Sequence, residues 1–166
     1  MKNLSMIAAV GNNFELGLNN QLLCHLPADL KYFKSTTLGC PVIMGDKTWV
    51  SLPKKPLPNR RNIVITLNKE AQYEGCELVH TLEDAMALVK DEKESFIIGG
   101  ATIYALFINI VGKLYLTRIH SDFKADVYFP KIDENDWNLI EETFVPKDEN
   151  NKYDLTFQTF LRKDSL

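Results

Sequence analysis

One aspartate lies among apolar residues near the start of the chain, and its position suggests that it binds a partner. Counted from Leu26, Asp29 stands three positions on, Leu30 four and Phe33 seven, and these spacings share one face of a helix. An aspartate is rarely buried unpaired, because removing water from a carboxylate is costly. The pattern predicts either recognition of a donor-rich ligand or a structural role, in which the carboxylate caps its own helix or meets a buried arginine.

Glycines follow two short apolar runs, and both places could hold an anionic ligand. Residues 95–98 lead into Gly99 and Gly100, and an earlier run ends at Gly45 and Asp46. Glycine lets a ligand approach the backbone closely, and N–H groups at a helix start attract anions. Two such sites at strand ends of one sheet would bracket a dinucleotide. The alternatives are a tight turn at the glycine pair and a simple helix cap at Asp46.

The segment 12–24 is long, polar and carries Gly17 between several leucines. A long loop in a small domain is usually functional, and apolar anchors allow it to close over a ligand. We therefore predict that this segment is a loop that forms a lid.

Strand-type and helix-type patterns alternate along most of the chain. This alternation predicts an α/β fold with a mostly parallel central sheet and helices on both faces. Near the C-terminus, 137–145 and 153–161 alternate apolar and polar residues around a polar turn, which predicts an antiparallel hairpin at the sheet edge. The other expected strands are 4–10, 41–44, 62–66, 77–79, 95–98 and 113–119, and the expected helices are 26–38, 47–52, 82–89 and 101–108.

The composition fits one compact domain, which we expect to span residues 1–166. Of the 166 residues, 45% are hydrophobic, which is enough to bury a core. The net charge is −3 and the basic residues are scattered, which argues against nucleic acid or an anionic membrane as a partner. No apolar run reaches the ~18 residues of a membrane helix, and the N-terminal residues lack a cleavage-type site.

The cysteines and histidines show no metal-binding spacing, and we expect no metal. Cys24, Cys40 and Cys76 are odd in number and far apart, which fits free thiols in a reducing cytoplasm. No feature signals an oligomer, so we expect a monomer.

Taken together, these segments resemble bacterial dihydrofolate reductase over nearly the full length of the chain. Each block is modest, but their order and spacing together are specific. The matching blocks are Ile7-Ala8-Ala9, Asn19-Asn20, Leu26-Pro27-Ala28-Asp29-Leu30 with Phe33-Lys34, Pro41-Val42-Ile43-Met44-Gly45 with Thr48-Trp49, Leu57-Pro58-Asn59-Arg60, Ile98-Gly99-Gly100 with Tyr104, Leu114-Tyr115-Leu116-Thr117, and Asp126 with Phe129-Pro130.

The resemblance implies an enzyme that transfers a hydride from NADPH to C6 of dihydrofolate while N5 takes a proton. It implies that Asp29, supported by Thr117, binds the 2-amino group and N3 of the pterin, and that the proton reaches N5 through water near Asp29. It also implies that Arg60 binds the α-carboxylate of the glutamate tail. Antifolate inhibitors would be further ligands of this site.

The same resemblance implies two further groups of contacts, although any one of these residues could equally be plain core. The pterin and aminobenzoyl contacts would be Ile7, Leu30, Phe33, Leu52, Leu57 and Ile98. The cofactor contacts would be Ala9, Leu16, Gly17, Asn20, Leu22, Gly45, Lys47, Thr48, Thr66, His80, Gly99, Gly100, Ala101, Thr102 and Tyr104.

The chain departs from the family pattern in two places. Cys24 replaces the usual tryptophan, which in the family borders the pterin and helps to order water there, and Leu23 replaces the usual proline. Asp46 replaces an arginine that meets the cofactor's 2′-phosphate, while Leu67 and Thr102 replace two further contacts to it. An aspartate near a ribose favours a 2′-hydroxyl, which is compatible with additional use of NADH. Lys47, Thr66 and His80 could still supply donors to the phosphate, so we expect NADPH as the cofactor.

Two rival functions are consistent with parts of the pattern. One is a related pyrimidine or pterin reductase of the same fold, and Asp29 together with Arg60 argues against it. The other is a pterin-binding protein with weak catalysis, which Cys24 and Asp46 would suggest. Fold alone does not separate these functions.

Overall fold

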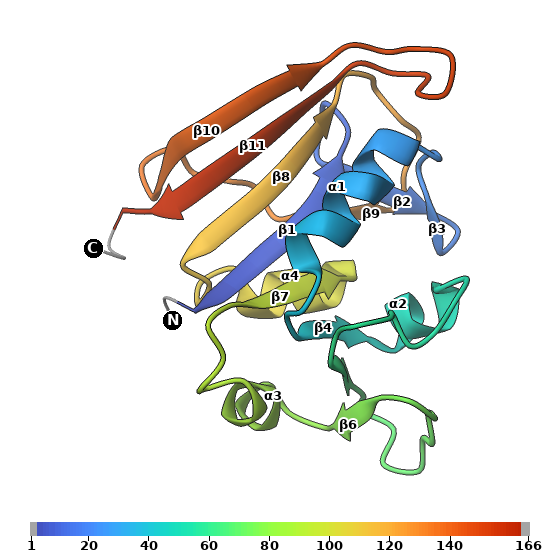
Figure 1. The fold of residues 1–166 in the computed structure, drawn as a ribbon, viewed down its shortest axis with the longest axis vertical. Coiled ribbons are helices and arrows are strands. Elements are labelled where there is room, and N and C mark those ends of the chain that lie inside the picture. The colour runs from blue at the N-terminus through green and yellow to red at the C-terminus, as the bar shows by residue number, and fades with distance from the viewer. Residues whose placement is uncertain (1–2, 164–166) are drawn as a thin grey trace.

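The computed structural model describes residues 3–163 and shows one central eight-stranded sheet (Figure 1). The strand order is β10-β11-β8-β1-β7-β4-β5-β6. The strands are β1 (Leu4–Val10), β4 (Val42–Gly45), β5 (Asn62–Ile65), β6 (Glu77–Val79), β7 (Ser95–Gly99), β8 (Lys113–Ile119), β10 (Trp137–Val145) and β11 (Leu155–Arg162).

The sheet is parallel from β8 to β6 and antiparallel at its other edge. β1 pairs in parallel with both β7 and β8, so the first strand occupies the middle of the sheet. β11 runs antiparallel to β8, and β10 runs antiparallel to β11. The predicted fold class and the predicted C-terminal hairpin are therefore confirmed.

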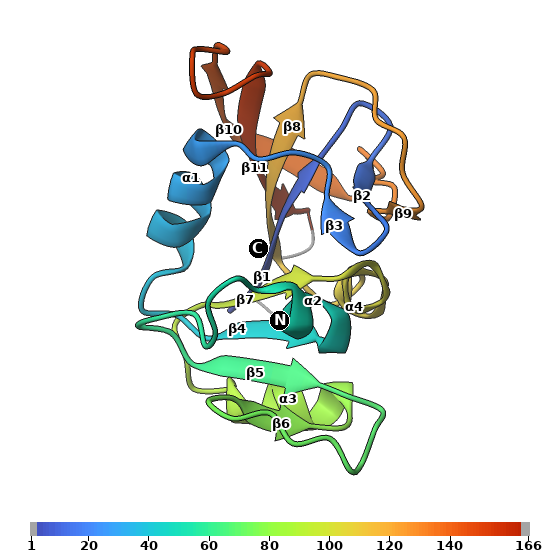
Figure 2. The same ribbon diagram turned by 90° about the vertical axis from the view of Figure 1, so that its right-hand side faces the viewer.

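Four helices cover the two faces of the sheet, as Figure 2 shows with the sheet turned toward its edge. Successive strand residues point to opposite faces, so in β4 Ile43 joins one apolar cluster while Val42 and Met44 join the other. The Ile43 cluster includes residues of α3 and α4, and the Val42 cluster includes residues of α1 and α2. The helices are α1 (Pro27–Thr37), α2 (Asp46–Ser51), α3 (Leu82–Leu88) and α4 (Ala101–Phe107).

Local sequence signals account for several of these boundaries. Pro27 opens α1, where its missing N–H costs nothing, and the preceding Leu26 is the N-cap residue. The Thr81 hydroxyl accepts a hydrogen bond from the Asp84 backbone N–H at the start of α3, as the capping pattern predicts.

The prediction that residues 12–24 form a loop is wrong in part. The segment contains β2 (Glu15–Leu18) and β3 (Gln21–Leu22), which pair with each other and, through β2, with β9 (Val127–Tyr128). Asn19 and Asn20 connect β2 to β3 with φ angles of 53° and 62°, a backbone that asparagine tolerates in two-residue hairpins. Runs this short carry too little periodicity to be recognised as strands.

Among residues 3–163, no helix is both long and apolar enough to cross a membrane.

Candidate active site

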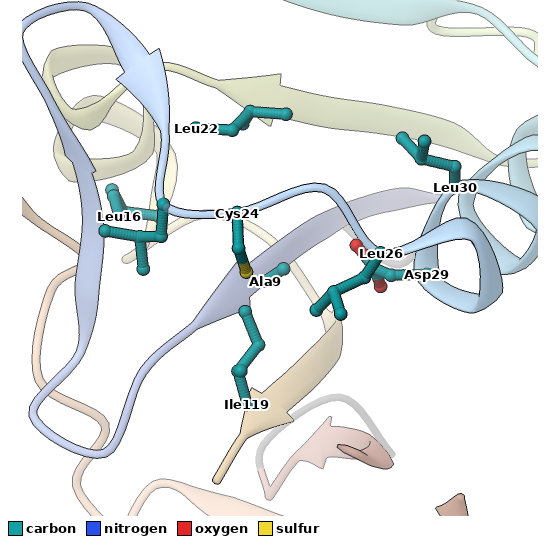
Figure 3. Close-up of a pocket in the computed structure, with 9 residues that line it drawn as sticks. Ala9, Leu16, Leu22, Cys24, Leu26, Asp29, Leu30 and Ile119 are labelled. Carbon is teal, nitrogen blue, oxygen red and sulfur yellow. The ribbon is translucent and has the colours of Figure 1, made fainter. Parts of the chain in front are cut away.

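A pocket opens between α1, the carboxyl end of the central strands and the β2–β3 segment (Figure 3). Its walls are almost entirely apolar, and Asp29 is the only acidic residue that lines it. Open α/β sheets commonly bind ligands at the carboxyl ends of their strands. The lining residues are Ala9, Leu16, Leu22, Leu23, Cys24, Leu26, Asp29, Leu30 and Ile119.

Asp29 projects from the first turn of α1 into this pocket, and a neighbouring strand holds its carboxylate. The Thr117 hydroxyl of β8 donates a hydrogen bond of 2.7 Å to Asp29 Oδ1. Burial raises the pKa of Asp29 above its ordinary value, and the bond from Thr117 partly opposes that rise. Among the described residues its hydrogen-bond partner is Thr117, so neither structural alternative, helix cap or buried arginine, accounts for this aspartate.

Cys24 occupies the part of the pocket wall between Leu16 and Asp29 in Figure 3. Burial raises the pKa of its thiol, the charge of Asp29 raises it further, and Lys152 lowers it. Cys24 therefore remains a neutral thiol at physiological pH. All three cysteines are free, as the sequence predicts.

The junction between β7 and α4 carries two glycines, of which Gly99 is buried and Gly100 leaves open space beside the backbone. Gly99 has a φ of +123°, which an L side chain adopts only with strain. A Cβ built on Gly100 would meet Thr48 Oγ1 at 3.4 Å and nothing else within 4 Å. This junction and the start of α2 therefore form a cradle with open space and N–H groups for an anionic ligand.

Arg60 is fixed beside the other end of α1. Its Nε donates to the Pro58 carbonyl at 2.9 Å, and its Nη1 donates to the Thr37 hydroxyl at 3.1 Å. Burial lowers the pKa of the guanidinium, which remains charged at physiological pH. These bonds use two of its five N–H donors and leave others for a carboxylate ligand. Lys55 instead donates to the carbonyls of Trp49 and Val50 at the end of α2.

Asp46 is the first residue of α2 and makes no helix-capping bond through its side chain. The Tyr73 hydroxyl donates a hydrogen bond of 2.8 Å to Asp46 Oδ1 instead. Nearby, His80 Nδ1 lies 2.9 Å from the buried Thr66 carbonyl oxygen, while the Leu67 side chain is 92% exposed. The Asp46 carboxylate is thus bound to the loop that carries Tyr73, in a region where the neighbouring Leu67 is exposed to solvent.

The structure places many of the predicted site residues in the pocket, in the adjoining apolar cluster and at the starts of α2 and α4. Tyr104 is buried, with its hydroxyl 2.7 Å from the Ile7 carbonyl and 2.9 Å from the Ile98 carbonyl, so one proton serves both oxygens. Gly17 and Asn20 lie on the β2–β3 hairpin, and Lys47 and Thr102 lie in the first turns of α2 and α4. Ala9, Leu16, Leu22, Asp29 and Leu30 line the pocket, and Ile7, Phe33, Leu52, Leu57 and Ile98 belong to the adjoining apolar cluster.

Sequence reasoning did not assign Leu26 and Ile119 to the pocket wall. Ile119 follows Thr117 by two positions in β8, so both side chains leave the same face of that strand. This period-two relation was the available signal. Leu23 is one of the leucines expected to anchor the lid over a ligand, and it lines the pocket.

The fold and the pocket define an α/β protein with a carboxylate in an apolar ligand pocket and a glycine cradle at the adjoining strand ends. The family model for dihydrofolate reductase matches residues 3–162. The chain is 42% identical over 137 residues to dihydrofolate reductase of Bacillus subtilis strain 168, covering 82% of this chain and 81% of that protein. It is 43% identical over 143 residues to the Neisseria gonorrhoeae enzyme, covering 86% of this chain and 88% of that protein. The chain belongs to the dihydrofolate reductase family.

A solved structure agrees with this assignment. Dihydrofolate reductase from Enterococcus faecalis, complexed with NADP(H) and RAB-propyl, superposes with a TM-score of 0.90 at 33% identity. The match covers 97% of this chain and 96% of that one.

Proposed function

We infer that this chain reduces 7,8-dihydrofolate to 5,6,7,8-tetrahydrofolate with NADPH as the hydride donor. The observation that carries this function is the Asp29 carboxylate, held by Thr117 in an apolar pocket of a chain that belongs to the dihydrofolate reductase family. A carboxylate has about four acceptor positions, so the bond from Thr117 leaves others for N–H groups of a pterin.

Asp29 would hold the 2-amino group and N3 of the pterin, and this contact orients the ring in the pocket. Its negative charge favours protonation at N5, and the proton would arrive through a water molecule near the carboxylate. The leucines around Asp29 limit the access of bulk water, which strengthens the effect of that charge.

The cradle at the β7–α4 junction fits the pyrophosphate of the cofactor, because Gly100 leaves open space and N–H groups at a helix start can bind an anion. When bound, NADPH supplies the hydride that C6 of the substrate accepts. On the nicotinamide side the contacts would be Ala9, Leu16, Gly17, Asn20 and Leu22. On the phosphate and adenosine side they would be Gly45, Lys47, Thr48, Thr66, His80, Gly99, Gly100, Ala101 and Thr102, with Tyr104 behind them.

The substrate's other end would meet Arg60 and the apolar cluster next to the pocket. The free N–H groups of Arg60 support a two-bond clamp on the α-carboxylate of the glutamate tail. Leu30 and the cluster residues Phe33, Leu52 and Leu57 would line the aminobenzoyl group between Arg60 and Asp29.

Loss of nicotinamide absorbance upon addition of dihydrofolate tests this function. We expect the purified chain to oxidise NADPH only when dihydrofolate is present. Folate binding without NADPH consumption would indicate the rival pterin-binding function, and turnover only with other heterocycles would indicate a related reductase.

The surroundings of Asp46 support a weak discrimination between NADPH and NADH. Asp46 carries negative charge at the start of α2, and its bond from Tyr73 fixes the carboxylate there. A carboxylate repels a 2′-phosphate but can accept a hydrogen bond from a 2′-hydroxyl. We therefore propose that NADPH is the main cofactor and that NADH also supports turnover.

Replacing Asp46 by arginine is expected to raise the ratio of kcat/KM for NADPH over NADH by roughly tenfold or more, because a charge-assisted bond to phosphate replaces a repulsion. Steady-state kinetics with both cofactors measures this ratio. Tyr73→Phe is the matched control, since it removes the phenol bond to Asp46 without changing the charge. A strong preference of the natural chain for NADPH would contradict the proposal that NADH also supports turnover.

We also propose a cytoplasmic monomer that binds antifolate inhibitors at the Asp29 pocket. Three free cysteines support a reducing location. Light scattering on the purified chain measures its mass in solution, and competition with dihydrofolate measures inhibitor binding.

A further inference from the structure

Glu15 is the one carboxylate, and the one charged residue type, among the buried polar residues of the described chain. It is 1% exposed and begins β2, immediately before the pocket residue Leu16. Nothing in the sequence indicates this burial, because Asn12, Asn13 and Glu15 together form the polar stretch that ends the first strand. A buried carboxylate needs hydrogen bonds to offset the loss of water.

The two carboxylate oxygens of Glu15 bind two different parts of the backbone. Oε1 accepts from the Asn13 N–H at 2.5 Å, within the turn between β1 and β2. Oε2 accepts from the Phe123 N–H at 2.6 Å, in the segment that leads from β8 to β9. Both ion pairs that occur among residues 3–163 involve Arg61, so the direct partners of this carboxylate are backbone N–H groups. The Arg118 guanidinium lies close enough for the charge of Glu15 to raise its pKa, against the lowering by burial.

The turn that Glu15 holds has a strained backbone. Phe14 has a φ of +63°, which is unfavourable for a bulky residue and persists only where surrounding contacts impose it. The Arg118 guanidinium stacks 4.7 Å from the centre of the Phe14 ring. A Cβ on Gly11 would come within 2.8 Å of Glu15 Oε1 and 2.7 Å of a Phe123 ring carbon. The packing therefore allows one position for the carboxylate.

We propose that Glu15 is a positioning residue for hydride transfer, an inference that rests on the proposed reductase function. Its carboxylate fixes the start of the β2–β3 segment to the 121–126 segment. Leu16, Leu22 and Cys24 of the β2–β3 segment form one wall of the pocket. Displacing this wall changes the distance between the reacting carbons and admits water, and both effects slow hydride transfer. Asp29 and Arg60 lie on other elements, so substrate binding depends much less on Glu15.

Single-turnover kinetics with the natural enzyme and the near-isosteric Glu15→Gln variant tests this proposal. The amide retains one acceptor oxygen but turns an NH₂ group toward the second backbone N–H, so one bond is lost. We expect hydride transfer to slow by about tenfold in Glu15→Gln and more in Glu15→Ala, with KM for dihydrofolate changed less than about twofold. NADPH deuterated at the transferred position should then show a kinetic isotope effect on kcat at least as large as in the natural enzyme.

Two further variants separate positioning from general destabilisation. Asp122→Asn weakens only exposed bonds from the side-chain amides of Asn12 and Asn13, at 3.1 and 3.3 Å, and should leave hydride transfer unchanged. Gly11→Ala should reproduce the slowing, because its methyl group displaces the Glu15 carboxylate.

The outcomes are distinct. An unchanged hydride-transfer rate in Glu15→Gln, with only a lower Tm, would overturn the proposal and leave a structural role. The proposal would also be overturned if every variant, Asp122→Asn included, showed a rise in KM for dihydrofolate as large as its fall in kcat. If the natural chain does not oxidise NADPH with dihydrofolate, the proposed function itself fails, whatever Glu15 does.

Discussion

The Asp29→Asn variant is expected to lose at least about 100-fold in kcat/KM for dihydrofolate at neutral pH. The amide can still accept one hydrogen bond from Thr117, which lies 2.7 Å from Oδ1 in the natural chain, but it removes the negative charge from the pocket. Without that charge, protonation at N5 loses its stabilisation. The loss should shrink as the pH falls, because acidic solvent can protonate N5 directly.

The same substitution should make the ligand-free protein more stable. Burial raises the pKa of Asp29 above its value in the unfolded chain, so ionising the carboxylate weakens the fold. The protonated Asp29 carboxyl therefore favours the folded state. This contribution to the free energy of unfolding is complete below the pKa of Asp29 in the unfolded chain, and it is lost as the pH rises through the pKa in the folded chain. Asparagine never ionises, so the Tm of the variant should exceed that of the natural chain at neutral pH, and the difference should narrow in acid.

Thermal unfolding and steady-state rates across a pH series measure both effects on the same samples. Thr117→Val is the matched control, because it removes the bonded hydroxyl and retains the carboxylate, and it should lose less activity. Near-natural activity of Asp29→Asn at neutral pH would contradict the proposed role. A lower Tm at neutral pH would mean that the carboxylate stabilises the fold.

Arg60→Lys is expected to raise KM for dihydrofolate by about 10- to 100-fold while kcat changes little, because a lysine retains the charge and loses the two-bond fork. The glutamate tail is remote from C6 and N5. Losing the two-bond contact to it therefore weakens binding of the ground state and of the transition state alike. Initial-rate kinetics over a range of substrate concentrations separates KM from kcat.

Arg60 also donates to Thr37 and to the Pro58 carbonyl, so the substitution could act through local structure. Dihydropteroate resolves this, because it has the same pterin and no glutamate tail. Its KM should be the same for the natural chain and for Arg60→Lys. A rise as large as that for dihydrofolate would assign Arg60 a structural role. Thr37→Val provides a second control, since it removes the hydroxyl that accepts from Arg60 Nη1 and leaves the guanidinium itself unchanged.

The sequence determined the parts of the fold that local and periodic signals encode. Apolar runs and helix caps are repeated over enough residues to identify the main strands and helices and the hairpin at 137–161. Asp29 stood out for the same reason, because a charge on an apolar helix face conflicts with the pattern around it. The exact helix ends and the short strands β2, β3 and β9 carry too few residues to show a period.

Tertiary structure alone decided which distant groups meet. Thr117 reaches Asp29 only because β8 lies beside β1 and α1 packs over the face of the sheet to which Thr117 points. Asp46 faces Tyr73 instead of capping α2, and Glu15 is buried because Phe123, far along the chain, supplies a second N–H. Such contacts depend on the spatial arrangement of segments that are far apart in sequence, and no periodic pattern records them. A polar residue that looks solvated in sequence can therefore be one of the most constrained in the fold.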